Sequence, residues 1–72
     1  MQGRIYGIRG VLTPGKVIIP NGGITDQFGR LLPPQPLYIV REATREEYTN
    51  QGPLHQIASF PSTTHYYEVL TD

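Results

Sequence analysis

The sequence predicts a small, mainly β domain: an SH3-like barrel or a strongly bent antiparallel sheet of about five short strands, with one short helix at about residues 45–51. Eight Gly and seven Pro residues interrupt the 72-residue chain. The intervening runs are rich in Ile, Val, Leu and Tyr, which is typical of strands joined by tight turns. Residues 1–72 are long enough for a single domain only. We prefer the barrel, because closure removes exposed strand edges.

The candidate strands are residues 4–8, 16–19, 24–25, 30–32, 37–41 and 65–70. Thr13-Pro14-Gly15-Lys16 predicts a β-turn, since Pro fixes φ and Gly accepts positive φ. Asn21-Gly22 is a strong hairpin signal, and residues 26–29 predict a further turn. We therefore expect residues 16–32 to form a meander of consecutive strands.

Leu37-Tyr38-Ile39-Val40 is a continuous apolar run, which favours a central, buried strand. The terminal runs, residues 4–8 and 65–70, are candidates for the sheet edges. Pro33-Pro34-Gln35-Pro36 satisfies P-x-x-P, but between two strands it favours a stiff connector over a ligand motif. The residues expected to form the core are Ile18, Ile39, Val40, Tyr48, Tyr67 and Val69.

One segment carries the signals of a helix. Thr44 and Glu47 form a T-x-x-E capping box, which satisfies free amides at a helix start. Gly52 and Pro53 are expected to end the helix. Tyr48 is its only large apolar side chain, so we expect a short polar plug over one end of a sheet.

Composition excludes several classes of function. Cysteine is absent, which removes disulfides, thiolate metal sites and thiol catalysis. Six Lys and Arg balance six Asp and Glu, whereas chains that bind nucleic acid usually carry a basic excess. The N-terminus has no signal-peptide pattern, and every apolar run is too short to span a membrane. We expect a cytoplasmic chain encoded by a bacterium, a phage or another mobile element.

The side chains suited to chemistry do not form a recognisable motif. His55 and His65 are ten positions apart and lack a metal-binding pattern. Hydroxyl residues precede His65, and Glu68 follows it, but there is no G-x-S-x-G elbow. The glycines are not spaced as in phosphate-binding loops. We therefore assign no catalytic, metal or cofactor-binding residue and do not expect an enzyme.

The first functional hypothesis is a protein-interaction or structural module, with self-association as a homodimer through a terminal strand or the Tyr66 face. The alternative is a single-stranded nucleic-acid binder, because four of the six basic residues precede Leu31 and tyrosines could stack on bases. A third hypothesis is an enzyme subunit whose site forms across an oligomer interface. The candidate residues for partner or nucleic-acid contact are Arg4, Tyr6, Arg9, Phe28, Arg30 and Tyr66.

Overall fold

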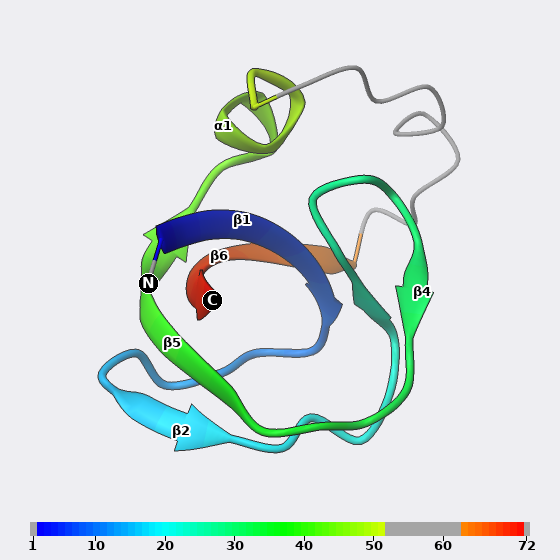
Figure 1. Cartoon of the computed structure of the whole chain (residues 1–72), viewed down its shortest axis with the longest axis vertical. Coiled ribbons are helices and arrows are strands. Elements are labelled where there is room, and N and C mark those ends of the chain that lie inside the picture. The colour runs from blue at the N-terminus through cyan, green and yellow to red at the C-terminus, as the bar shows by residue number, and fades with distance from the viewer. Residues whose placement is uncertain (1, 52–62, 72) are drawn as a thin grey trace.

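The computed structural model describes residues 2–51 and 63–71. They form one antiparallel sheet and one short helix, α1 (Arg45–Thr49), as Figure 1 shows. The strands are β1 (Gln2–Arg9), β2 (Lys16–Ile18), β3 (Ile24–Thr25), β4 (Leu31–Leu32), β5 (Leu37–Ala43) and β6 (Thr64–Thr71). The domain is therefore mainly β with one short helix, in agreement with the sequence.

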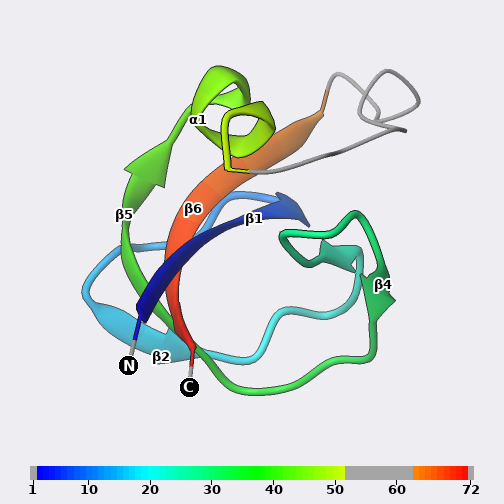
Figure 2. The same cartoon turned by 45° about the horizontal axis from the view of Figure 1, so that its top comes forward.

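The sheet is bent but open, so the preferred SH3-like barrel is wrong. Its strand order is β2-β5-β6-β1-β3-β4, and the outermost strands β2 and β4 do not pair with each other. Strands β5, β6 and β1 curve strongly (Figure 2). Both outer strands are very short, and Pro33 and Pro34 follow β4 directly. Because proline lacks a backbone N–H, β4 cannot continue as a closing strand.

The two terminal strands lie at the centre of the sheet, which corrects the prediction that they form its edges. β1 and β6 pair along their whole length, from Gln2 opposite Thr71 to Arg9 opposite Thr64. β6 then pairs with β5, and β1 pairs with β3. The first and last described residues consequently lie side by side (Figure 2). β1 and β6 have eight residues each, and each pairs with two neighbouring strands, so they provide most of the backbone pairing in the sheet.

The expected meander over residues 16–32 forms only in its second half. β3 and β4 make a hairpin whose turn contains Gly29 at φ +82°. β2, however, pairs with β5 rather than with β3. Asn21 does not adopt positive φ, which a two-residue Asn-Gly hairpin turn requires, and Gly22 and Gly23 adopt it instead. The glycines redirect the chain away from β2.

The core lies on one face of the bent sheet. Its buried cluster is Tyr6, Ile8, Ile24, Leu37, Ile39, Tyr67 and Val69. Ile39, Tyr67 and Val69 are buried as expected. Ile18 and Val40 are only partly buried: Ile18 lies on the outermost strand β2, and Val40 lies on β5 at the register shift between Ile39 and Arg41, next to the buried Ile39. The continuous apolar run of β5 is therefore not buried throughout.

The helix begins with the predicted capping box. The Thr44 hydroxyl accepts from the Glu47 N–H at 3.2 Å, and the Glu47 carboxylate accepts from the Thr44 N–H at 3.2 Å. The helix ends at Thr49 with Asn50 as its C-cap, two residues earlier than expected. The expected stop signals Gly52 and Pro53 lie outside the described residues. Helix α1 is neither long nor apolar enough to cross a membrane, and the described residues contain no other helix.

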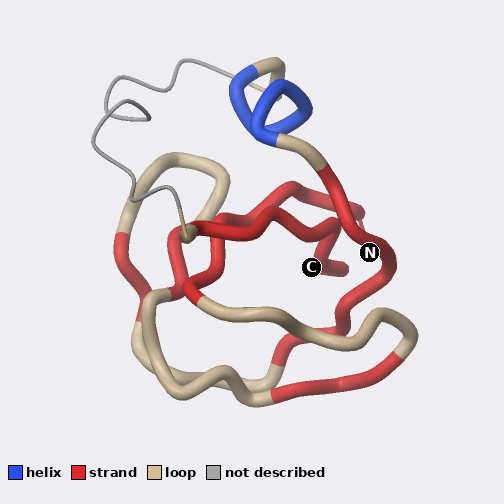
Figure 3. Tube along the Cα trace, turned by 180° about the vertical axis from the view of Figure 1, so that it is seen from behind, coloured by secondary structure: helices blue, strands red, loops and turns tan. Residues whose placement is uncertain are grey.

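The helix lies over one end of the sheet (Figure 3), and Tyr48 anchors it there. Its side chain is fully buried, and its ring lies 5.4 Å from that of Tyr66 on β6. Its hydroxyl donates to the Asp26 carbonyl at 2.6 Å, which joins the helix to the β3–β4 turn. Burial, followed by the nearby Asp26 charge, raises the pKa of Tyr48 to about 12. The short helix that we expected over one end of the sheet is thus held there mainly by one aromatic side chain, that of Tyr48.

Candidate functional site

An apolar row crosses four strands on the face of the sheet that lies opposite the core. We define the apolar row as Val17, Tyr38, Leu70 and Gly3, which are successive cross-strand neighbours on β2, β5, β6 and β1. Directly opposed residues of an antiparallel sheet project to the same face. The row therefore ends at β2, an outer strand of the sheet.

The β2 end of the apolar row is the exposed end. Val17 is 62% exposed and Tyr38 is 42% exposed, and Ile19, which follows β2, is 61% exposed. Ile18, between Val17 and Ile19, packs against the core. Single exposed apolar residues are ordinary on a protein surface, but a contiguous group beside a free strand edge is typical of an interaction site.

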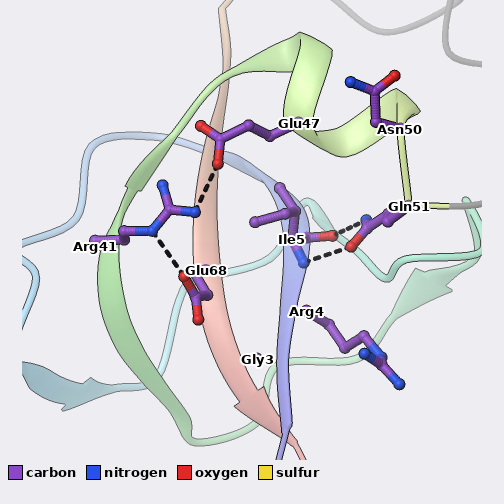
Figure 4. A pocket seen from close by; sticks show the side chains of 8 residues that line it. All are labelled: Gly3, Arg4, Ile5, Arg41, Glu47, Asn50, Gln51 and Glu68. Atoms are coloured by element: carbon purple, nitrogen blue, oxygen red, sulfur yellow. Dashed lines mark hydrogen bonds and ion pairs between the residues drawn. The ribbon is translucent and has the colours of Figure 1, made fainter.

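A charged clamp lies next to the apolar row and joins the sheet to the helix (Figure 4). The Arg41 Nε donates to Glu68 Oε1 at 2.7 Å, and the Arg41 Nη2 donates to Glu47 Oε2 at 2.6 Å. Hydrogen bonds to these carboxylates raise the pKa of Arg41, with that to Glu47 the larger cause. The bond from Arg41 is the main cause that lowers the pKa of Glu47. The three side chains hold α1, β5 and β6 in place.

The clamp borders a hollow of about 400 Å³ between α1 and the sheet, which Gly3, Ile5 and Gln51 also line (Figure 4). The Glu68 side chain occupies the space above Gly3, where an added Cβ would overlap its carboxylate. Gln51 uses its amide to bond the backbone of Ile5. The polar groups that line the hollow are thus largely engaged with one another, so it serves as a structural joint.

Neither the hollow nor the rest of the described chain presents a recognisable centre of chemistry. Residues 2–51 and 63–71 contain no group of three or more His, Cys, Asp or Glu side chains that could hold a metal. His65 is exposed on β6 opposite Ile8, whereas His55 lies outside the described residues. The clamp carboxylates bond to Arg41, and the one hydroxyl bonded to them among the described residues, that of Thr44, is engaged in the helix cap.

The candidate contact residues of β1 do not form one face. Arg4 and Arg9 stand at positions of opposite parity on β1 and therefore project to opposite faces of the sheet. Tyr6 is only 7% exposed and belongs to the core. Burial, followed by the Asp26 charge, raises its pKa. Its ring is not available for stacking on a base.

The remaining candidates lie in two separate places. Phe28 and Arg30 come together on the β3–β4 turn, with the guanidinium carbon 5.2 Å from the ring centre. Both residues are exposed. Tyr66 lies against Tyr48, half-buried beneath the helix, and burial raises its pKa. The six candidates therefore do not converge on a single site.

The candidate contact residues named from the sequence do not include Val17, Tyr38 or Arg41. The apolar run of residues 37–40 predicted a strand buried on both faces, so the exposure of Tyr38 was not expected. Pairing residues 16–18 with 37–39 places Val17 opposite Tyr38, but the Asn-Gly signal favoured a different partner strand. Arg41 follows an apolar run, and no spacing in the sequence indicates that Glu47 and Glu68 converge on it.

Comparison with protein-family models, curated proteins and solved structures finds no match for this chain. Its function is therefore inferred from its own residues. Leu31 on the other outer strand is also exposed, but the exposed end of the apolar row sets two opposed apolar side chains, Val17 and Tyr38, beside an outer strand of the sheet.

Proposed function

We propose that the chain is a protein-interaction module that docks a partner on the exposed end of the apolar row. One observation carries this proposal: Val17 and Tyr38 lie directly opposite each other, both exposed, where the sheet ends at β2. Covering these side chains removes apolar surface from water, which favours association by about 25 cal/mol per Å² before the costs of binding.

The charge distribution around this surface supports a protein partner. Arg41 on β5 is engaged by Glu47 and Glu68, which among the described residues leaves Lys16, beside Val17 on β2, as a single unpaired cation that projects to the other face of the sheet. The formal net charge of the whole chain is zero. Long-range electrostatic steering is therefore weak, and short-range apolar contact is the main source of affinity.

Single-stranded nucleic acid is the second candidate partner, and the Phe28–Arg30 pair is the observation that favours it. An exposed ring beside a guanidinium is a small stacking platform. Arg4 and Arg9 do not extend this platform, since they project to opposite faces of β1. Oligonucleotide binding that weakens steeply with salt and is lost in Phe28→Ala would support this function over the first.

Site-specific photo-crosslinking tests the docking surface. A photoreactive amino acid is placed at position 38 in one chain and, as a control, at position 46, an exposed site on α1. In cells that express the chain, we expect defined crosslinked products from position 38 and not from position 46. Val17→Asp should suppress these products, because Val17 is the direct neighbour of Tyr38. Equal products from both positions, or products unaffected by Val17→Asp, would contradict the proposal.

A further inference from the structure

We propose that the docked partner is an extended peptide segment that adds to β2 as a further strand, with an apolar residue opposite Val17 and an acidic residue opposite Lys16. This inference rests on the proposed docking surface and identifies what occupies it. Strand addition is a common mode of peptide recognition, in which backbone bonds give affinity and alternate side chains give specificity.

The backbone of β2 is suited to strand addition. Within the described residues β2 pairs only with β5, and it stands last in the sheet order. Its other edge consequently presents N–H and C=O groups without a strand partner. Val17 belongs to the exposed end of the apolar row, while Ile18 packs against the core, so every second residue of an added strand would lie beside exposed apolar surface.

The opposite end of the sheet is less suited to the same role. β4 contains two residues, and Pro33 and Pro34 follow it. Neither proline donates a backbone hydrogen bond, so an added strand would find few donors there. The glycine and proline residues near β2 lie outside its three paired positions.

Lys16 determines the charge of the expected partner. It is exposed at the start of β2, and none of the ion pairs among the described residues includes it. It projects to the face opposite to that of Val17, since the two are consecutive in a strand. An acidic residue next in sequence to the partner's apolar residue would therefore lie beside Lys16.

The size of the surface favours a peptide over a second copy of the chain. Even taken together, the exposed surfaces of Val17, Ile19 and Tyr38 amount to no more than a few hundred Å², on the order of the largest apolar patch of an ordinary monomer. Stable dimers bury about 800 Å² on each partner. Pairing two three-residue β2 strands would fall short of that area, whereas a weak, transient peptide contact needs less.

The probe is the peptide Thr-Val-Thr-Val-Glu-Thr, blocked at both ends, which in antiparallel pairing places Glu opposite Lys16 and Val opposite Val17 and Ile19. Its binding to the isotope-labelled full chain is followed by NMR. We expect shifts confined to β2 and neighbouring β5 residues, and slowed exchange of β2 amide protons. Val17→Asp should weaken binding about tenfold through the loss of apolar contact. Shifts elsewhere, or no saturable binding, would overturn strand addition.

A charge exchange provides the specific control. A peptide with Lys in place of Glu should bind the natural chain about 2–5-fold more weakly, and Lys16→Glu should reverse this preference. An unchanged preference in Lys16→Glu would refute the role of Lys16. If light scattering instead shows a dimer that Val17→Asp disrupts, a second copy occupies the surface and the peptide proposal is wrong. Crosslinking from position 38 without binding of either peptide would reject strand addition while retaining the docking surface.

Discussion

The side-chain amide of Gln51 pairs with the backbone of Ile5 as a neighbouring strand would. Gln51 Nε2 donates to the Ile5 carbonyl at 2.6 Å, and Gln51 Oε1 accepts from the Ile5 N–H at 2.8 Å. Farther along β1, Gly7 and Ile8 have β3 as their partner on that edge, but β3 does not reach Ile5. Gln51 thus provides hydrogen-bond partners for the Ile5 N–H and C=O groups, which have no neighbouring strand on that edge of β1.

Gln51→Ala should destabilise the domain by about 1–3 kcal/mol, because it leaves two partly buried backbone groups without their partner. Gln51→Glu should cost at least as much near neutral pH, since an ionised carboxylate still accepts from the Ile5 N–H but has no proton to donate to the Ile5 carbonyl and sets a second oxygen against it. Asn50→Ala, at the exposed neighbouring position, is the matched control. Urea unfolding measures all three variants, and equal stability of Gln51→Ala and Asn50→Ala would show that the amide pair is unimportant.

Tyr48 should make the domain sensitive to alkaline pH. Its pKa is raised from 10.0 to about 12, mainly by burial, so the unfolded chain loses this proton at lower pH than the folded chain. Stability from this group is complete below pH 10 and declines as pH rises towards 12. Urea midpoints measured across this range should fall, and Tyr48→Phe should reduce the decline. The raised pKa values of Tyr6 and Tyr66 leave a residual dependence.

Tyr48→Phe also removes the hydroxyl that donates to the buried Asp26 carbonyl. At pH 7 we expect a loss of about 0.5–1.5 kcal/mol, typical of one hydrogen bond. Tyr38→Phe is the control, because its ring lies on the exposed face. A decline above pH 10 that is equally steep with and without the Tyr48 hydroxyl would assign the alkaline transition to other groups.

Glu47 has two roles that separate variants can distinguish. One carboxylate oxygen accepts from the Thr44 N–H, and the other accepts from Arg41. Thr44→Ala removes the cap and should cost about 1 kcal/mol. Glu47→Gln retains an acceptor for the cap but loses the ion pair with Arg41.

Acid titration separates the two roles of Glu47. Its folded pKa lies below the ordinary value of 4.5, chiefly because Arg41 bonds to the carboxylate. Its contribution is present above the unfolded pKa and is lost as pH falls through the folded pKa. The stability difference between the natural chain and Glu47→Gln should therefore shrink below pH 4.5, while the Thr44→Ala difference persists. A pH-independent effect of Glu47→Gln would show that the ion pair contributes nothing.

Local signals in the sequence predicted local structure well. The capping box at Thr44 and Glu47 forms as expected, Gly15 adopts the predicted positive φ, and the turn expected at residues 26–29 forms with Gly29 at positive φ. Each of these features depends on the backbone preferences of a few neighbouring residues, and these preferences do not depend on the tertiary fold. The mainly β character follows in the same way from short apolar runs between turns.

The sheet order and the candidate surface could not be predicted, because both depend on pairings between distant segments. β1 meets β6 across almost the whole chain, and no local preference records this. Once β5 lies between β2 and β6, its residues alternate between the core and the opposite face. The exposure of Tyr38 and the burial of Ile39 are thus consequences of topology rather than of apolar character.

This alternation can be tested on adjacent residues of β5. Ile39 is fully buried opposite Val69, so Ile39→Ala should cost about 2–5 kcal/mol, a large part of the stability of so small a domain. Tyr38→Ala removes a larger side chain but should cost less than Ile39→Ala, because 42% of Tyr38 is already exposed. Urea unfolding compares the two. If Tyr38→Ala proved the more damaging, Tyr38 would belong to the core, and the apolar row would lose the residue on which its role as a docking surface depends.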